Sequence, residues 1–310
     1  MGRLLTEAFA VARAAFDEAD EAFAGADSGR GVSTAALSLR QVCFHGPDEQ
    51  LGLTEITQPA ILAASIAACR VLATEGVEPA FVAGHSLGEY SANVAAGTMS
   101  LASAVGVVRR RGRYMQEAVP VGEGAMAAIL GLEPDAVARV CEEASQGEVV
   151  SPANINCPGQ VVIAGATAAV GRAVECAKAA GARRAIPLSV SAPFHCAMMR
   201  PAQERLEPLL RSMPVQDPRI PVVANVDAEP KRGAADAIDA LIRQVSAPVM
   251  WEDVVRRLAS EGVSTYVEVG PGSVLSGLVK KIDKGARILR FSSPADLDAV
   301  IAGCSISAER

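Results

Sequence analysis

The sequence is poor in aromatic residues, in histidine and in basic charge. Phe, Trp and Tyr make up 4% of the 310 residues, only three histidines are present, and the formal net charge is −6. A chain of negative charge lacks the basic surface that generic nucleic-acid binding requires, so we expect no nucleic-acid partner. The scarcity of histidine also leaves few candidates for any chemistry that needs an imidazole.

Long apolar runs and paired cysteine motifs are missing as well. No uninterrupted apolar run reaches the length of about 18 residues that suggests a membrane-spanning helix, and the N-terminal sequence MGRLLTEAFAVARAAFDEADEAF contains no signal-peptide core. The seven cysteines show neither CxxC nor zinc-finger spacing. Scattered thiols in odd number are typical of a reducing compartment, so we expect a cytoplasmic protein without a membrane or metal partner.

The composition that is present is that of a globular chain, with 50% hydrophobic and 21% charged residues. Predicted helices and short β-rich runs alternate along the chain, which favours an α/β fold with a mainly parallel sheet and helices on both faces. Between residues 122 and 190 the predicted order is strand, helix, strand, strand-like turn, helix, strand, as in a ferredoxin-like unit. We therefore expect a large α/β domain from residues 1–121 and 191–310, with a ferredoxin-like small subdomain inserted at 122–190.

The sequence VAGHSLGEY contains the pattern G-x-S-x-G at residues 84–88, between a predicted strand at Pro79–Ala83 and a predicted helix at Leu87–Ala96. A serine in such a strand-to-helix turn is exposed as a nucleophile, and its small neighbours let strand and helix approach closely. The helix start also directs the main-chain N–H of Leu87 toward an oxyanion formed on the substrate. Ser86 is the predicted nucleophile; a glycine turn with an incidental serine is the structural alternative.

A nucleophilic serine needs a general base, which is most often a histidine. His85 adjoins Ser86 and points elsewhere along the turn, and His45 lies in CFHGPDE, an acidic turn typical of a surface. His195 lies in SVSAPFHCAMM, a loop that enters a predicted helix, and loops on a scaffold commonly carry catalytic residues. His195 is therefore the predicted base. No Asp or Glu stands out as a third member, and we consider a backbone carbonyl as the group that orients the imidazole.

Six segments now resemble, in order, motifs of a known family: GHSLGEYSA, RGRYMQEA, NCPGQVVIAG, SAPFH, PVMW and VEVGPGSVLSGL. The family is that of the malonyl-CoA:acyl-carrier-protein transacylases of fatty-acid and polyketide synthesis, and the resemblance covers most of the chain. It implies a hydrolase-like α/β fold with a ferredoxin-like insertion. It also implies a ping-pong reaction through a malonyl-serine ester on Ser86, with His195 as base and the phosphopantetheine thiol of acyl carrier protein as acceptor. Malonyl-CoA is then a substrate, and no bound cofactor is required.

The same resemblance assigns further site residues. The main-chain carbonyl that orients the histidine in the family falls here at Met250, within PVMW, which agrees with the missing carboxylate. Gln58 is implied to line the site, with the start of a helix as its structural alternative. Asn154 is implied to border the pocket, with a role in an Asn/Pro/Gly turn as its alternative. Phe194 and Leu87 match family members that select malonyl over bulkier methylmalonyl groups.

A malonyl group carries a free carboxylate, which a guanidinium binds through two parallel hydrogen bonds. The predicted helix Leu101–Ala118 carries four arginines. Arg110 and Arg113 point away from its apolar stripe, and for them a solvated face is the ordinary interpretation. Arg109 and Arg111 flank the stripe, so the helical spacing leaves both as candidates. The RG pair of the family selects Arg111.

The carrier protein of this family is acidic, as is this chain, so docking needs a local basic patch. Lys280-Lys281 and Arg183-Arg184 are candidates, although solvated charge is the ordinary interpretation of such pairs. We expect a monomer. The sequence does not distinguish a fatty-acid from a polyketide pathway.

Two other functions compete with malonyl transfer. A serine esterase or thioesterase would use the same serine and base. An N-terminally truncated, inactive homologue would act as a binding subunit. The second alternative arises because the family begins with a short strand and a GQGSQ loop ahead of the segment that matches MGRLLTEAF, and this piece is missing. We expect the first Met to lie inside a longer reading frame.

Overall fold

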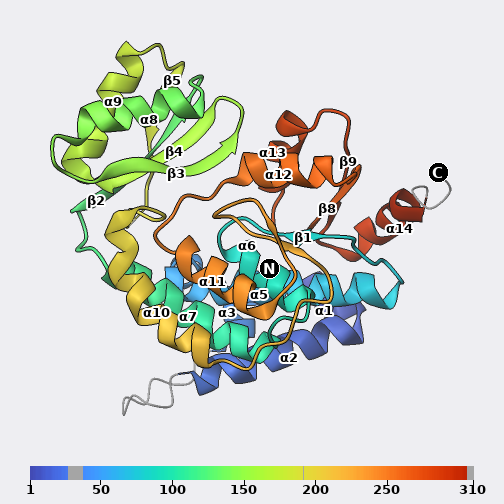
Figure 1. Ribbon diagram of the computed structural model, residues 1–310. Helices are drawn as coiled ribbons and strands as arrows, with labels where there is room; N and C mark the ends of the chain where they lie inside the picture. The colour runs from blue at the N-terminus through green and yellow to red at the C-terminus, as the bar shows by residue number, and fades with distance from the viewer. Residues whose placement is uncertain (27–37, 191, 306–310) are drawn as a thin grey trace.

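The structure is a computed structural model that describes residues 1–26, 38–190 and 192–305. It is a mixed α/β architecture in which helices surround small sheets (Figure 1). The helices are α1 (Arg3–Ala8), α2 (Ala10–Gly25), α3 (Leu39–His45), α4 (Asp48–Leu51), α5 (Thr54–Thr74), α6 (Leu87–Ala95), α7 (Leu101–Glu117), α8 (Pro134–Ser145), α9 (Thr167–Ala179), α10 (Arg200–Ser212), α11 (Ala234–Gln244), α12 (Trp251–Ser260), α13 (Val274–Ile282) and α14 (Leu297–Ser305). The strands are β1 (Val82–Ala83), β2 (Gly124–Leu130), β3 (Val150–Cys157), β4 (Gln160–Ala166), β5 (Arg184–Pro187), β6 (Val222–Val223), β7 (Pro230–Lys231), β8 (Thr265–Val269) and β9 (Arg287–Phe291).

The largest sheet has the strand order β3-β4-β2-β5, and all of its pairings are antiparallel. Along the chain its elements follow as β2, α8, β3, β4, α9 and β5, in the upper left of Figure 1. Apolar residues of α8 and α9, among them Val140 and Val170, pack with those of β2 and β4 in a core of their own. The prediction of a turn at Asn154 is wrong, because this residue lies inside β3. The turn is confined to residues 158–159, where Gly159 takes φ +68°.

The rest of the chain forms short ladders. β1 pairs in parallel with β6, β6 pairs antiparallel with β7, and β8 pairs in parallel with β9 in a separate sheet. The sequence predicted one mainly parallel sheet, whereas the parallel pairs are divided between two sheets. The β1–β6 ladder is short because β1 runs into the turn at Gly84 and β6 follows Pro221, which has no N–H to donate.

Helix α5 is the central helix of the large core. It packs against α2, α6 and α7, and most of its residues are buried. Within the described residues it is the one helix whose length and composition would suffice to cross a membrane, and 67% of its most apolar window is buried inside the fold. The apolar residues between Leu4 and Phe23 recur at helical spacing, which predicts one long helix; the structure divides it into α1 and α2, because Phe9 adopts an extended conformation with φ −123°.

Helix α11 was not predicted, although its sequence AADAIDALIRQ carries a helical signal. Ile238, Leu241 and Ile242 recur at helical spacing and are buried. The helix ends at Gln244, and the chain then continues beside β3, where Val249 N–H donates to Ala153 O and Val249 O accepts from Ile155 N–H. The last turn of α11 therefore lies where the chain passes from the large core to the four-stranded sheet.

Candidate active site

Ser86 occupies the sharp turn between β1 and α6. Its backbone has φ 51° and ψ −105°, a conformation that residues other than glycine rarely adopt and that is common at functional sites. The turn depends on Gly84, since a Cβ added there would lie 2.1 Å from the main-chain carbon of Gly88. The side chain of Asn225 supports both ends of the turn: its Oδ1 accepts from Ser86 N–H at 2.7 Å, and its Nδ2 donates to Gly84 O at 2.8 Å.

The structure brings Ser86 and His195 together across the interval that separates them in sequence. Ser86 Oγ lies 2.7 Å from His195 Nε2, and His195 Nδ1 lies 2.9 Å from the main-chain oxygen of Gln244. A carbonyl only accepts, so Nδ1 carries the hydrogen and Nε2 is free to accept one from Ser86. Burial, and then the charge of Arg111, lower the pKa of His195 to about 3. The resting imidazole is thus neutral and can take a proton.

The assignment of Met250 as the residue that orients His195 is wrong. Met250 O accepts from Val254 N–H at 2.9 Å, as the first hydrogen bond of α12, and is therefore used by that helix. The carbonyl that contacts His195 belongs instead to Gln244, in the last turn of α11. Carbonyls in the last turn of a helix have no partner inside the helix and lie at the negative end of its dipole. This carbonyl therefore favours a histidine that becomes protonated.

Arg111 lies in the same site, with 2% of its surface exposed. One of its terminal nitrogens donates to Ser86 Oγ at 3.1 Å and to Gln244 Oε1 at 2.9 Å, and the other donates to Gln58 Oε1 at 2.9 Å. The guanidinium also lies 5.3 Å from the centre of the Tyr90 ring. These partners are all neutral. Within the described residues no carboxylate forms an ion pair with Arg111, so the cation retains its capacity to bind one.

The other arginines of α7 face elsewhere. Arg109, the second candidate, is buried; it donates to Phe23 O at 2.7 Å and lies 3.8 Å from the centre of the Phe23 ring. It therefore holds two helices together and does not face Ser86. Arg113 was predicted on a solvated face; its side chain is 18% exposed and pairs with Glu55 at 2.9 Å. Arg110, also predicted there, is half-buried.

Gly112, the residue after Arg111, lies where α7 packs closely against α5. A Cβ at this position would lie 2.5 Å from Thr54 O and 2.8 Å from the Cα of Glu55. The absence of a side chain lets α7 approach the first turn of α5 closely. That approach brings Gln58, one turn further along α5, within hydrogen-bond distance of Arg111.

The remaining predicted site residues, Leu87, Phe194 and Asn154, differ in how they are placed relative to Ser86. Leu87 begins α6, so its N–H is one of the first four, which have no partner inside the helix. Phe194 is half-buried between the large core and the core formed by Met126 and Cys196. Asn154 is buried and its backbone forms a β-bridge with Val249. Among the described residues, it makes no hydrogen bond with Ser86, His195 or Arg111.

Sequence reasoning missed Gln244, Asn225 and the burial of Glu89. Asn225 lies two residues after the end of β6, beyond the carboxyl end of the strand that pairs with β1, where functional side chains often lie. Gln244 closes an amphipathic stretch that the prediction left unassigned. Burial raises the pKa of Glu89 to about 7, against the opposing effect of its hydrogen bond from Asn225. No local pattern distinguishes this Glu from an ordinary residue of a first helical turn.

The site combines a serine activated by a neutral imidazole with a buried guanidinium that has no carboxylate partner among the residues the structure describes. This arrangement suits nucleophilic transfer of an acyl group that itself carries a carboxylate. Nowhere in the described ranges do three His, Cys, Asp or Glu side chains gather as they would around a metal ion.

Comparison with known proteins agrees with this chemistry. Residues 1–289 match the family described as acyl transferase domain. The malonyl CoA-acyl carrier protein transacylase of Bacillus subtilis is 45% identical over 97% of this chain and 92% of its own length, and that of Escherichia coli K12 is 47% identical over 93% and 92%. The acyl carrier protein S-malonyltransferase of Vibrio cholerae superposes with a TM-score of 0.91 at 47% identity, covering 97% of this chain and 94% of its own. A malonyl-transacylase solved in complex with a type II PKS acyl-carrier protein gives 0.91 at 43%, with 98% and 94% covered.

Proposed function

The chain belongs to the acyl transferase domain family, and from this premise we propose that it transfers a malonyl group from malonyl-CoA to the phosphopantetheine thiol of acyl carrier protein. One observation carries the proposal. Ser86 Oγ lies 2.7 Å from His195 Nε2 and 3.1 Å from a terminal nitrogen of Arg111, so nucleophile, base and carboxylate-binding group meet at one oxygen.

In the first half-reaction, Ser86 Oγ gives its proton to His195 Nε2 and attacks the thioester carbonyl of malonyl-CoA. The negative charge that develops on the carbonyl oxygen is stabilised by the N–H of Leu87 at the start of α6. The C–S bond then breaks, His195 returns the proton to the departing sulfur, and coenzyme A leaves as a thiol. Ser86 holds the malonyl group as an ester.

The second half-reaction reverses these roles with a different thiol. The phosphopantetheine thiol of the carrier gives its proton to His195, and its sulfur attacks the ester carbonyl. The bond to Ser86 Oγ breaks and the proton returns to that oxygen. Because the Gln244 carbonyl accepts from Nδ1–H throughout, the imidazole keeps one orientation while it gains and loses a proton once in each half-reaction.

Arg111 supplies selectivity for the acyl group. The carboxylate of a malonyl ester is one CH₂ away from the acyl carbon, so an ester on Ser86 presents it to the guanidinium that already contacts Oγ. Gln58 holds the far side of that guanidinium, and Phe194 and Leu87 flank the reacting residues in sequence, where we propose that they exclude bulkier acyl groups. Asn154 stays a prediction as a residue that borders the pocket.

We propose the finer fold assignment on the same footing. The order β2-α8-β3-β4-α9-β5 and an antiparallel sheet with its own core support a ferredoxin-like subdomain at residues 122–190. The parallel β1–β6 pair and the serine turn between β1 and α6 support a hydrolase-like domain made of residues 1–121 and 191–310.

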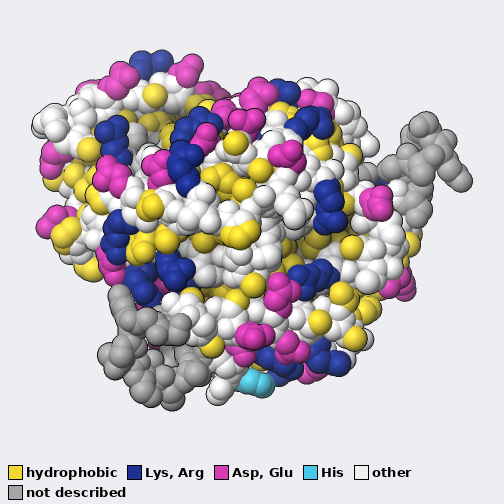
Figure 2. Space-filling model, turned by 60° about the horizontal axis from the view of Figure 1, so that its bottom comes forward, with side chains coloured by type: hydrophobic (Ala, Val, Ile, Leu, Met, Phe, Trp, Pro, Cys, Tyr) yellow, Lys and Arg dark blue, Asp and Glu magenta, His cyan; other side chains and the backbone are white. Residues whose placement is uncertain are grey.

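The basic pairs Arg183-Arg184 and Lys280-Lys281 lie at one end of the four-stranded sheet. Arg184 aligns with Leu130, Leu130 aligns with Gln160, and Lys281 Nζ lies 3.2 Å from Gln160 Oε1. All four basic residues are exposed. Basic and acidic side chains are interspersed on the face seen in Figure 2, so docking of an acidic carrier depends on such local pairs rather than on a field of one sign.

The state of the cysteines bears on the compartment in which the protein works. All seven cysteines lie within the described residues and are free thiols, which supports a reducing compartment and hence the cytoplasm. The monomeric state and the absence of a nucleic-acid partner stay predictions, the first checked by light scattering of the purified protein.

The acceptor distinguishes the proposed transferase from a serine esterase or thioesterase. After the enzyme is loaded from malonyl-CoA, the label is followed with and without carrier protein that bears phosphopantetheine. We expect rapid appearance of malonyl-carrier and slow release of free malonate. Malonate release that is as fast as transfer would replace the proposal by hydrolysis, and a carrier without its phosphopantetheine arm is the control.

A further inference from the structure

Glu89 is a buried carboxylate behind the reacting groups, with 1% of its surface exposed. It lies in the first turn of α6, and its Oε2 accepts two hydrogen bonds, from Asn225 N–H at 2.9 Å and from Gln244 Nε2 at 2.8 Å. Attraction between a carboxylate and the positive N-terminal end of the helix dipole explains a Glu on the surface at this position, but not one withdrawn from water. Both of its partners are neutral groups that themselves hold the site.

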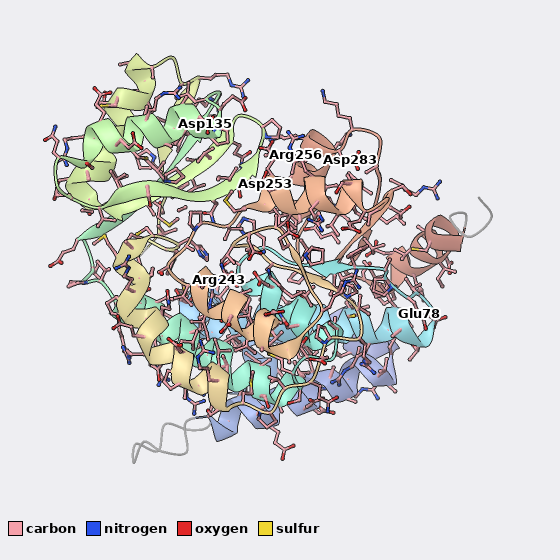
Figure 3. All side chains as sticks on the ribbon, viewed as in Figure 1. Glu78, Asp135, Arg243, Asp253, Arg256 and Asp283 are labelled. Atoms are coloured by element: carbon pink, nitrogen blue, oxygen red, sulfur yellow. The ribbon has the colours of Figure 1, made fainter. Side chains whose placement is uncertain are left out.

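Gln244 connects Glu89 to the main chain of Ser86 and to the side chains of Arg111 and His195. Its Nε2 also donates to Ser86 O at 2.9 Å, its Oε1 accepts from Arg111 at 2.9 Å, and its main-chain oxygen contacts His195 Nδ1 at 2.9 Å. Gln244 is fully buried, so each of these contacts lacks competition from water. Arg243, labelled at α11 in Figure 3, marks the end of the helix from which this side chain comes.

The orientation of the Gln244 amide is set by Arg111 on the side of its oxygen and by Glu89, together with the main-chain oxygen of Ser86, on the side of its nitrogen. An amide can be turned over so that its oxygen and nitrogen exchange places. Arg111 is a donor only and requires Oε1. Glu89 is an acceptor only in its ionised form, which predominates above its pKa of about 7, and in that form it requires Nε2. Opposite charges on the two sides therefore admit one orientation of the amide.

The same arrangement keeps the two charges apart. Glu89 contributes to stabilising the positive charge of Arg111, but the intervening amide prevents a direct ion pair. A carboxylate in contact with Arg111 would occupy the place of the substrate. A neutral amide in that place holds the guanidinium toward Ser86 without competing for it.

We propose that Glu89 is a positioning residue for acyl selection: through the Gln244 amide it holds Arg111 toward Ser86 while leaving the guanidinium free for the carboxylate of the acyl group. The inference rests on the proposed malonyl transfer. It assigns no contact between Glu89 and the substrate. Loss of Glu89 should therefore slow ester formation from acyl groups that carry a carboxylate more than ester formation from acyl groups that do not.

The test is a double-mutant cycle between Glu89→Gln and Arg111→Ala at a pH above the Glu89 pKa of about 7, so that the carboxylate is ionised. It is read as the rate of ester formation on Ser86 from malonyl-CoA and from acetyl-CoA. We expect Glu89→Gln alone to lower the malonyl/acetyl rate ratio about tenfold, the size of an ordinary coupling between groups in one hydrogen-bond network. In the Arg111→Ala background it should have no further effect on that ratio. A role in folding alone would lower both rates equally and leave the ratio unchanged.

A charge-swapped variant keeps the proposal testable if Glu89→Gln is poorly folded. Glu89→Gln combined with Gln244→Glu has the same net charge and nearly the same volume, retains the main-chain carbonyl that His195 needs, and places the carboxylate on Arg111. We expect it to lose malonyl preference while acetyl ester still forms. Glu252→Gln is the matched control, because Glu252 is also buried but pairs with Arg256, labelled on α12 in Figure 3, away from the site.

Different results would overturn the proposed function and the positioning role of Glu89. A wild-type protein that forms no malonyl ester at Ser86 would overturn the proposed function. A wild type that transfers malonyl normally, together with a Glu89→Gln variant whose malonyl/acetyl ratio is unchanged or whose effect adds to that of Arg111→Ala, would overturn the positioning role alone.

Discussion

His195 Nδ1 lies 2.9 Å from the main-chain oxygen of Gln244, where the last turn of α11 leaves a carbonyl without a helical partner. A helix end thus takes the position that a carboxylate holds in many serine enzymes, and its dipole favours the imidazolium formed during the reaction. The oxygen belongs to the backbone, so no side-chain substitution removes it. The base itself is therefore the group to test.

We predict that His195→Ala lowers the rate of ester formation on Ser86 by about 10²–10⁴-fold, the usual contribution of a general base. Rapid-quench mass spectrometry with malonyl-CoA measures this rate. His45→Ala is the control, since His45 is exposed at the end of α3 and should leave the rate unchanged. Equal rates for the two variants would remove His195 from the mechanism.

Arg111→Ala should weaken transition-state binding of malonyl thioesters by about 2–5 kcal/mol, as expected when one partner of a buried charge pair is truncated. Acetyl thioesters, which present no carboxylate, should be affected far less. The ratio of kcat/KM for malonyl-CoA to that for acetyl-CoA reports the difference. Arg113→Ala on the same helix removes an ion pair with Glu55 instead, and a loss of malonyl preference in that variant would contradict the assignment.

Gly112→Ala should reduce the free energy of unfolding by about 1–3 kcal/mol, because its methyl group would overlap the backbone of α5. Malonyl preference should fall as well, since the same displacement moves Gln58 from Arg111. Gly106→Ala is the control on the same helix: its Cβ would meet only a terminal nitrogen of Arg110, at 3.6 Å, so it should stabilise by up to about 1 kcal/mol. Denaturant unfolding measures both, and identical changes would refute the close-contact argument.

Glu89 makes stability depend on pH. Its pKa is raised from 4.5 in an exposed carboxyl to about 7 in the fold, chiefly by burial. Between these values the folded chain retains a proton that the unfolded chain has lost, so the free energy of unfolding falls as the pH rises through this window, by about 3 kcal/mol at 1.36 kcal/mol per pKa unit. His195, with its lowered pKa, contributes a change of opposite sign.

Comparison of wild type with Glu89→Gln isolates the effect of Glu89, because His195 is common to both. The stability of the wild type relative to the variant should be greatest below about pH 4.5 and fall steadily until about pH 7. Urea unfolding across this range measures the difference. Parallel stability curves would mean that Glu89 titrates normally.

The sequence predicted those parts of the site that depend on local backbone geometry. The turn at Ser86 needs Gly84 and a helix directly after the serine, and both requirements are visible in one short segment. Helix periodicity reduced the arginines of α7 to two, but the choice between them depends on what each one faces. Arg109 meets the ring of Phe23 and Arg111 meets Ser86, and only tertiary packing distinguishes these environments.

The residues that prediction missed act through long-range contacts. Asn225 and Gln244 reach Ser86 from positions far along the chain, and neither has a local pattern that marks a buried amide. The misplaced carbonyl at Met250 has a related cause: the segment between Gln244 and Met250 lies against β3, and the sequence does not reveal which of its oxygens faces the imidazole. The ladders of the large domain were predicted as one sheet because alternation of helix and strand does not determine how far each pairing extends.

Mass spectrometry of the intact protein after brief exposure to malonyl-CoA tests the central claim most directly. We expect the wild type to gain one malonyl group, located by peptide mapping at Ser86 and released when carrier protein with its phosphopantetheine thiol is added. Ser86→Ala should gain none. A malonyl group that attaches equally to Ser86→Ala, or a wild type that stays unmodified, would contradict the account.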